Sequence, residues 1–346
     1  MGSGFFPLDQ QLGVRKARWS EQVAQLAVWL SGLVTFEQAA EILRRIGQVR
    51  ISDSSAWRQA QEWGEEFAAI EAAERVLANA LPGHRDVLRR EARSGGRMGV
   101  ALDGSMMHIR DEGWKEFKVG CVFEVEVRPT RDPETGVWEE QAHAANNSYR
   151  AHLGGPELFG QLIWAEARRR DWERALDTQV LGDAAPWIWN VAQEHFYDSH
   201  QLVDWYHATE HLGKAAHLLK GEGTLAAKQW FNARQTLLFQ GHAASIAQEL
   251  SDAAQQRPAD AEGLAEQARY FHNNQRRMHY QELREEDWLI GSGMVESGAK
   301  QFKARFTGPG MRWSRSGAEK LLPVRASILS RRFDAYWRRA YNSPPS

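Results

Sequence analysis

The sequence predicts a mixed α/β protein in which an all-helical segment precedes a five-stranded sheet that carries a helical insertion. Before Gly95, apolar residues recur at helical spacing. From Gly95 onward the pattern changes to short apolar runs and period-two alternation, clearest from Glu116 to Arg128. From Thr224 to Tyr280 the spacing is helical again, without strand signals. These three observations fix the fold class that we expect.

The amino-terminal segment is expected to hold helices over residues 19–33 and 36–46, and a third from the serine-rich stretch at Ser52 towards Phe67. Two short helices joined by a turn that contains Gly47 resemble a helix-turn-helix. The second helix would present four polar side chains at the end that reads bases in such motifs: Ser54, Ser55, Arg58 and Gln59. The alternative is an ordinary helix pair that never touches DNA.

The sheet region is expected to hold strands near 98–103, 116–128 and 141–150, a helix over 156–173, a strand at 178–181, a helix over 186–195, a strand at 200–203 and a helix from Trp205. Three meandering strands followed by two crossovers give a mixed five-stranded sheet. This is the strand order of the ribonuclease-H-like fold.

The predicted domains follow from these elements. A helical, DNA-binding domain covers 1–94, the sheet domain covers 95–212 together with 289–346, and the all-helical insertion covers 213–288. A last helix from about Gly293 to Phe306 is expected to return to the sheet, and a basic carboxy-terminal helix follows from Arg315.

Composition excludes several classes of protein. Cys121 is the single cysteine among 346 residues, so neither a disulfide framework nor a cysteine zinc site can form within one chain, which fits a reducing cytoplasm. We find no signal-peptide pattern and no apolar run of membrane-spanning length, and therefore expect no membrane span.

Charge is distributed unevenly along the chain. Residues 300–339 contain 11 Lys and Arg against Glu319 and Asp334, a balance of +9, whereas the whole chain carries −2 and the remainder therefore −11. Such a block predicts a local surface for a polyanion, with a solvated helix face as the alternative.

Three carboxylates stand where the fold would bring them together. Asp103 ends the first predicted strand, Asp183 ends the fourth, and Glu296 begins the last helix. Like charges held close are costly without a cation, and oxygen ligands without a thiol or histidine cluster suit Mg²⁺. Two such ions catalyse phosphodiester chemistry. For each carboxylate alone, a turn or helix-cap residue is the alternative.

Several longer stretches resemble the bacterial ISKra-type insertion-sequence transposases: Ala101-Leu-Asp-Gly-Ser-Met-Met-His-Ile-Arg110, Glu112-Gly-Trp-Lys-Glu-Phe-Lys-Val-Gly120, Leu181-Gly-Asp-Ala-Ala-Pro-Trp-Ile-Trp189, Asp204-Trp-Tyr-His-Ala-Thr-Glu-His-Leu212, Gly291-Ser-Gly-Met-Val-Glu-Ser297 and Gly310-Met-Arg-Trp-Ser314. The resemblance runs from Phe5-Phe-Pro-Leu-Asp9 to about Trp337.

The resemblance implies an Asp-Asp-Glu transposase with a ribonuclease-H-like domain and a helical insert between Asp183 and Glu296. Asp103, Asp183 and Glu296 would hold two Mg²⁺ ions, with Mn²⁺ as a substitute. The partners would be double-stranded DNA, as terminal inverted repeats and as target, bound by a homodimer at the nucleoid of the bacterial cytoplasm. Relatives often carry a cysteine-rich segment ahead of the Phe5 block, and this chain begins at that block.

Further residues extend the predicted site. Asp204-Trp-Tyr-His207 matches an Asp-x-x-His motif of Mutator-like transposases, so His207 either faces the catalytic centre or is a helix-start histidine bonded to Asp204. A basic track is predicted to grip DNA phosphates: Lys300, Lys303, Arg305, Arg312 and Arg315. Trp288 and Trp313 are either core residues or base-stacking residues.

Two other functions remain open at this stage. The chain could be a DNA-binding regulator without chemistry, or a structure-selective nuclease of the same fold that cuts branched DNA without a preference for element ends.

Overall fold

The computed structural model describes residues 19–80, 95–131 and 136–342, so the Phe5 block lies outside the described residues. Within them a five-stranded mixed sheet forms from β1 (Arg97–Ile109), β2 (Gly113–Arg131), β3 (Trp138–His152), β4 (Thr178–Gly182) and β5 (His200–Val203). The strand order is β3-β2-β1-β4-β5. The first three strands pair antiparallel, and β4 pairs parallel with both β1 and β5. The predicted mixed sheet is confirmed.

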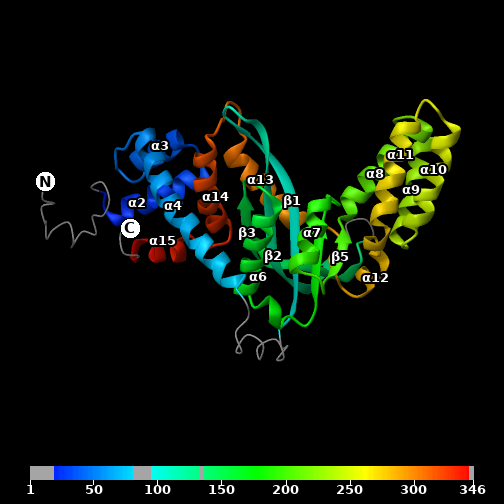
Figure 1. Cartoon of the computed structure of the whole chain (residues 1–346), viewed down its shortest axis with the longest axis horizontal. Helices are drawn as coiled ribbons and strands as arrows, with labels where there is room; N and C mark the ends of the chain where they lie inside the picture. The colour runs from blue at the N-terminus through cyan, green and yellow to red at the C-terminus, as the bar shows by residue number, and fades with distance from the viewer. Residues whose placement is uncertain (1–18, 81–94, 132–135, 343–346) are drawn as a thin grey trace, which may run out of the picture.

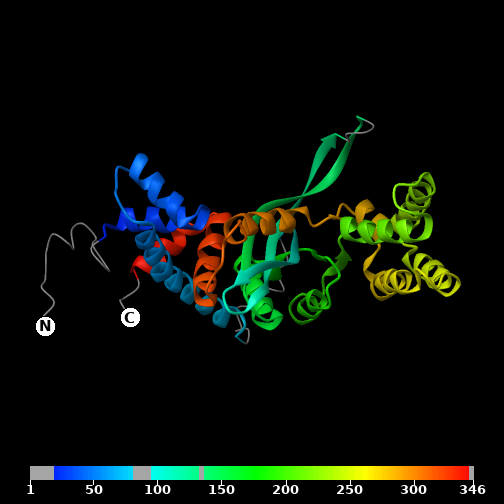
Figure 2. The same ribbon diagram turned by 90° about the horizontal axis from the view of Figure 1, so that it is seen from above.

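Helices cover both faces of the sheet. On one face α6 (Pro156–Arg169) lies so close to β2 that a Cβ on Gly120 would stand 2.7 Å from Ile163. On the other, α13 (Gly293–Phe306) lies over β1 to β3, and Phe302 packs against Phe117 of β2. Figure 2 shows α13 and α6 on opposite sides of the sheet, with the hairpin of β2 and β3 projecting from the body. The last helix therefore returns to the sheet, as predicted.

A helical arm leaves the sheet after β5. It consists of α8 (Trp205–Lys220), α9 (Leu225–Phe239), α10 (Ala243–Gln256), α11 (Ala261–Asn274), the 3₁₀ turn Gln275–Arg277 and α12 (Tyr280–Glu285). Figure 1 shows these helices as a unit that extends from one end of the sheet, with α7 (Pro186–His195) at its base. The predicted boundary at 213 falls inside α8, because this helix runs without a break from the sheet edge into the arm.

The two ends of the described chain form a helical bundle at the opposite end of the sheet (Figure 1). It contains α2 (Glu21–Leu33), α3 (Phe36–Arg45), α4 (Asp53–Ala78), α14 (Arg315–Leu329) and α15 (Phe333–Asn342). Ser20, Thr35, Ser52 and Ser314 cap four of these helices with their side chains. In the bundle core, the rings of Trp63 of α4 and Trp337 of α15 pack at a tilt, with their centroids 4.3 Å apart.

Two expectations for this bundle are corrected. The third helix continues well beyond Phe67, to Ala78, because Glu71 and Glu74 pair with Arg150 of β3 and Arg75 donates a hydrogen bond to Gln161 of α6. The predicted single carboxy-terminal helix is two helices, separated by a turn in which Arg331 adopts a φ of +56°.

None of the helices in the described ranges is both long and apolar enough to cross a membrane.

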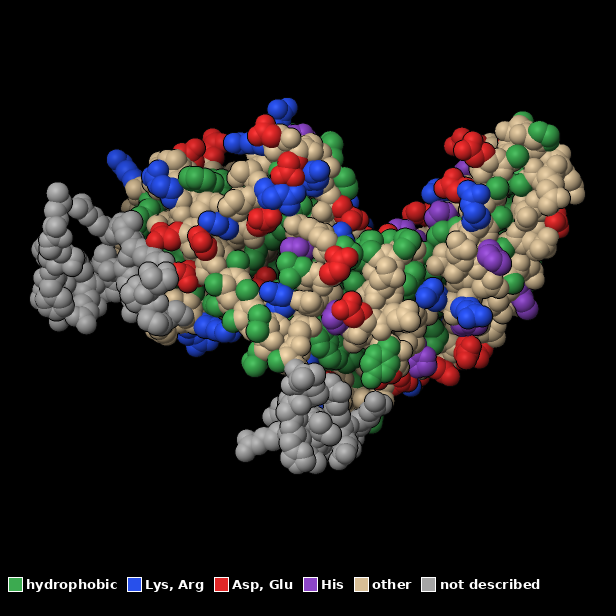
Figure 3. Space-filling view, in the orientation of Figure 1, with side chains coloured by type: hydrophobic (Ala, Val, Ile, Leu, Met, Phe, Trp, Pro, Cys, Tyr) green, Lys and Arg blue, Asp and Glu red, His purple; other side chains and the backbone are tan. Residues whose placement is uncertain are grey.

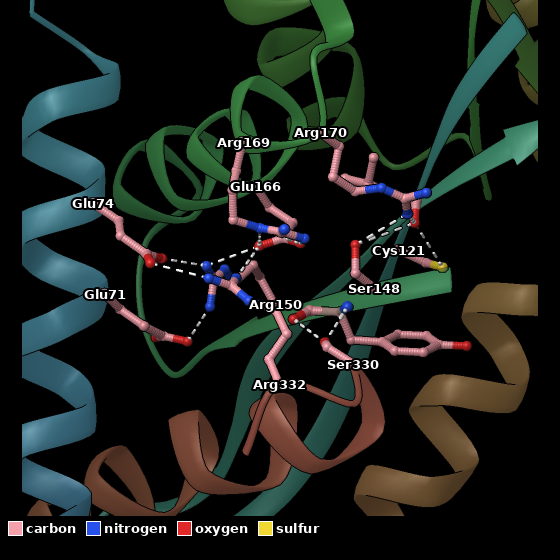
Figure 4. Close-up of polar contacts among 12 residues, drawn as sticks. Glu71, Glu74, Cys121, Ser148, Arg150, Glu166, Arg169, Arg170, Ser330 and Arg332 are labelled. Atoms are coloured by element: carbon pink, nitrogen blue, oxygen red, sulfur yellow. Dashed lines mark hydrogen bonds and ion pairs between the residues drawn. The ribbon is translucent and has the colours of Figure 1, made fainter. Parts of the chain in front are cut away.

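A buried ion network joins the bundle to the sheet. Arg150 of β3, 3% exposed, contacts Glu71 and Glu74 of α4 and Glu166 of α6 at 2.7–2.8 Å. Figure 4 shows Arg332, from the turn before α15, which pairs with Glu74 and Glu166. Burial acts to raise the pKa of Glu166, but Arg150, Arg169 and Arg332 outweigh it and hold that pKa at about 2. Glu166 is therefore the charged centre of the network.

Replacing Arg150 tests whether this network holds the bundle in place. Arg150→Met should destabilise the protein by about 3–5 kcal/mol, because the buried Glu71 would lose the guanidinium that contacts it, whereas Glu166 would keep Arg169 and Arg332. Arg44→Met is the matched control, since Arg44 forms an exposed pair with Glu41 on α3, and it should leave stability close to wild type. Chemical denaturation measures both, and equal midpoints for the two variants would contradict the role assigned to Arg150.

Candidate functional site

The parallel pairing of β1 with β4 sets two aspartates side by side. Leu102 pairs with Gly182, so Asp103 and Asp183, the next residue on each strand, leave the pair at the same edge. Asp103 also pairs with Val119 of β2, which shares a face with Phe117, the residue that contacts α13. Asp103 therefore points to the face that carries Glu296. The prediction that Asp103 ends its strand is wrong, because β1 continues to pair with β2 as far as Ile109.

The pKa of Asp103 is raised because this carboxyl is buried and lies near Asp183. Burial and then the neighbouring charge of Asp183 raise the pKa of Asp103 from its usual 3.8 to about 6, and His207 and Lys303 offset part of the effect. The carboxylate is thus destabilised in its charged form, and a cation between Asp103 and Asp183 would relieve the cost. This is the electrostatic signature of a site that takes positive charge.

Asp183 is held by a tight turn between β4 and α7. Its Oδ1 accepts a hydrogen bond from the amide of Ala185 at 3.0 Å, and Pro186 begins α7. Between them Ala184 adopts a φ of +79°, a left-handed conformation that is unfavourable for a residue with a Cβ. Asp183 can act both as a turn residue and as a site residue, because its bond to Ala185 uses one of its two carboxylate oxygens.

Asp204 joins three elements at the same edge. Its amide donates to the carbonyl of Gly182 at 2.8 Å, and its fully buried carboxylate caps α8 by accepting from the amide of His207 at 2.9 Å. The other carboxylate oxygen accepts from the amide of Ser292, directly before α13. Trp205 donates its amide to the carbonyl of Ile290 at 2.9 Å. Asp204 thereby fixes the start of the Glu296 helix against the end of β4.

One close group of possible metal ligands results. Ligand atoms of Asp204, His207 and Glu296 lie within 4.8 Å of one another, and no other group of three His, Cys, Asp or Glu ligands this close is found in the described ranges. This group of Asp204, His207 and Glu296, which we call the metal-binding group, could hold a metal ion. It shares Glu296 with the predicted triad, whereas Asp103 and Asp183 lie outside it; the charge of His207 acts to lower the pKa of Asp103.

Sequence analysis missed Asp204 as a possible ligand. The signal was present in the Asp-x-x-His motif, but there the aspartate was weighed only as the partner of His207. The helix-start alternative for His207 is supported, since its amide is bonded to Asp204, and its ring belongs to the metal-binding group; that it faces a catalytic centre stays a prediction.

Glu296 is positioned by the packing of α13 on β3. The Tyr149 hydroxyl donates to the carbonyl of Met294 at 3.1 Å. A Cβ on Gly298 would stand 2.3 Å from the Tyr149 ring, so only glycine permits this approach. Lys300, 77% exposed, lies one turn after Glu296 with its ammonium 3.9 Å from that carboxylate. Lys303 is exposed on the same helix.

The other predicted DNA contacts separate into exposed and buried residues. Ser54 and Arg58 are exposed and Ser55 half-buried at the start of α4, and Arg312 is exposed after α13. Gln59 is 3% exposed and accepts a hydrogen bond from the Trp63 indole. Arg305 is 2% exposed and donates to the carbonyl of Ser31. Gln59 and Arg305 therefore have no surface to offer DNA, and their predicted role is corrected.

Part of the basic block is neutralised within the fold. Arg315 pairs with Glu112, Lys320 with Glu65, and Arg332 with Glu74 and Glu166. Trp288 and Trp313 are buried, which favours the core alternative for both. The exposed cations closest in sequence to the metal-binding group are Lys300 and Lys303.

Comparison with protein-family models and with curated proteins finds no match for this chain.

The raised pKa of Asp103 predicts a pH-dependent stability in the metal-free protein. Because the folded pKa of about 6 exceeds the usual 3.8, Asp103 should contribute stability as pH falls from about 7 towards 4, so that the stability of the wild type rises relative to that of Asp103→Asn. Asp103→Asn removes the charge and should stabilise the protein at pH 8 by on the order of 1–3 kcal/mol.

Thermal unfolding in a chelator between pH 4 and 8 measures this effect. Asp252→Asn, on the exposed surface of α10, serves as the control and should follow the wild-type profile. The same pH profile for wild type and Asp103→Asn would contradict the crowding of Asp103 by Asp183.

Proposed function

We propose that this protein is a DNA transposase of the Asp-Asp-Glu class, which cleaves DNA strands and joins them to a target with divalent metal ions. The observation that carries the proposal is the convergence of Asp103, Asp183 and the helix of Glu296 on one edge of the sheet. These residues come from β1, from the end of β4 and from a helix more than a hundred residues later; the interval from Asp183 to Glu296 is 113 positions.

The sheet supports a ribonuclease-H-like assignment for the catalytic domain. The order β3-β2-β1-β4-β5, with three antiparallel strands followed by two parallel ones, is the order expected for that fold. The arm then corresponds to the insertion between the second aspartate and the glutamate. The sequence motifs quoted above point to the same class.

The donor set fits a divalent cation. Carboxylate oxygens from Asp103, Asp183 and Glu296 suit Mg²⁺ or Mn²⁺, and the imidazole of His207 is a ligand that Mn²⁺ tolerates better than Mg²⁺. When bound, two such ions activate a water or 3′-hydroxyl and stabilise the leaving oxygen of a phosphodiester. Asp103, whose pKa is raised by burial and by Asp183, would lose its proton more readily with a cation beside it.

The protein's own residues would orient the reaction. Asp204 fixes the start of α13, so that Glu296 would not swing with the arm. Lys300 and Lys303, one and two turns after Glu296, would bind phosphates on either side of the cut. Figure 3 shows the surface hollowed between the sheet body and the arm, a shape that a DNA duplex could enter. Assembly as a dimer would bring two element ends together.

The first test is cleavage of a duplex that carries the genomic flanks of the protein's own gene, in Mg²⁺ or Mn²⁺. Wild type should nick at discrete positions at a terminal repeat. Asp183→Asn should lower the rate by more than about 100-fold, because it removes a metal ligand and not merely a supporting residue. Sequencing gels measure both the position and the rate of the cuts.

Asp177→Asn is the matched control, because Asp177 precedes the same strand that Asp183 follows and lies at its opposite end. It should cut at nearly the wild-type rate. Equal cleavage by wild type and Asp183→Asn would reject the proposal. Specific binding without cleavage would favour a regulator, and cutting of branched DNA without a preference for repeat ends would favour a structure-selective nuclease.

A further inference from the structure

A groove of about 660 Å³ adjoins the metal-binding group at the root of the arm. It lies between the edge strand β3, the start of α8 and the segment that leads into α13. Its chemically distinctive lining residues are Gln141, His143, Trp205, Tyr206, Phe239 and Arg284. None of the described lining residues is Asp or Glu, although the neighbouring centre is acidic. The groove thus offers aromatic faces, neutral hydrogen-bonding groups and one guanidinium.

Tyr206 forms the open aromatic face of this groove. Tyr206 is 62% exposed. One edge of the ring is held against the backbone of Gly291, where a Cβ would stand 3.0 Å from the ring. The ring is therefore backed by protein on one side and open to a ligand on the other.

The groove adjoins the metal-binding group, although none of Asp204, His207 and Glu296 lines it. A Cβ placed on Gly291 would stand 3.0 Å from the Tyr206 ring and 3.8 Å from Oδ2 of Asp204. Tyr206 also stands between Asp204 and His207 in the first turn of α8. A ligand on the Tyr206 ring would therefore lie next to a metal ion or substrate bound at Asp204, His207 and Glu296.

We propose that this groove binds an unpaired nucleotide of the DNA strand that is cut, with its base stacked on Tyr206 and a backbone phosphate facing Arg284. The proposal rests on the function proposed above, which puts a DNA strand at the metal-binding group. Every base has a π-face, so an exposed ring recognises unpaired nucleotides without regard to sequence. A guanidinium suits the phosphate, and the lack of carboxylates in the groove removes the repulsion that the acidic centre would cause. The enzyme therefore takes strands that are frayed or single-stranded beside the cut.

The test is the binding of a fluorescently labelled oligo-dT and of a blunt duplex of equal length, measured by anisotropy in Ca²⁺ with the full-length protein. Tyr206→Ala should weaken oligo-dT binding by about 5- to 150-fold, the range for loss of one stacked base. Tyr206→Phe keeps the ring and should stay within about twofold of wild type. Binding of the blunt duplex should change much less, because its bases are already stacked on one another.

Tyr197→Ala is the control for loss of an exposed tyrosine. Tyr197 is 74% exposed and lines a different cavity, which also contains Asp177, Glu194 and Asp198. It should bind oligo-dT as wild type does. A 2-aminopurine base in the oligonucleotide should be quenched by wild type and Tyr206→Phe and not by Tyr206→Ala.

Several outcomes would overturn the inference. Unchanged oligo-dT binding by Tyr206→Ala would do so, as would an equal loss in Tyr206→Phe or in Tyr197→Ala. Because binding is measured apart from cutting, the two proposals fail separately. Cleavage that depends on Asp183, together with normal binding by Tyr206→Ala, rejects only the nucleotide groove. A Tyr206-dependent loss of binding in a protein that never cleaves rejects the transposase and leaves the groove as a nucleotide site.

Discussion

The buried carboxylate of Asp204 is the contact on which the candidate site depends. It bonds the first turn of α8 and the amide of Ser292, while its own amide bonds Gly182 at the end of β4. With the bond between Trp205 and Ile290, these contacts close the arm at its root, so that the chain leaves the sheet and returns to it at one point. The helices between 205 and 290 can therefore vary in length without moving Glu296 away from the sheet edge. A charge-assisted bond shielded from water is strong enough for this task.

The opposite end of the sheet is organised by charge in a different way. The carboxylates of α4 and α6 meet the arginines of β3 and of the turn before α15, and Arg150 and Arg332 are shared among several of them. One member of the basic block near the carboxy terminus, Arg332, is thereby used to hold the bundle together and is not available to a polyanion. The net charge of a segment, counted along the sequence, does not show which of its charges face solvent and which face one another.

The sequence predicted the order of the sheet because strand alternation and turn residues are local signals, and because short connections leave few topologies. It also predicted that Asp103 and Asp183 would meet, since this needs only that β1 and β4 be neighbours. Burial of Gln59 and Arg305 could not be predicted in this way. Their partners, Trp63 and Ser31, belong to helices whose faces are chosen by packing between distant segments. The same reason hid the length of α4 and the bond from Asp204 to Ser292, which spans 88 positions.

Local costs gather at the sheet edge that carries the candidate site. Asp103 is destabilised by Asp183, Ala184 is held in a left-handed conformation, and Tyr206 exposes an aromatic ring. The ion network around Arg150 is equally charged, yet its carboxylates are matched by guanidinium groups at 2.7–3.0 Å. The difference is that the bundle completes its charge balance with its own residues, whereas the sheet edge carries an excess of carboxylate. An edge built in this way gains stability when a cation and a partner for the open ring arrive together, which is what binding of metal ions and a DNA strand would supply.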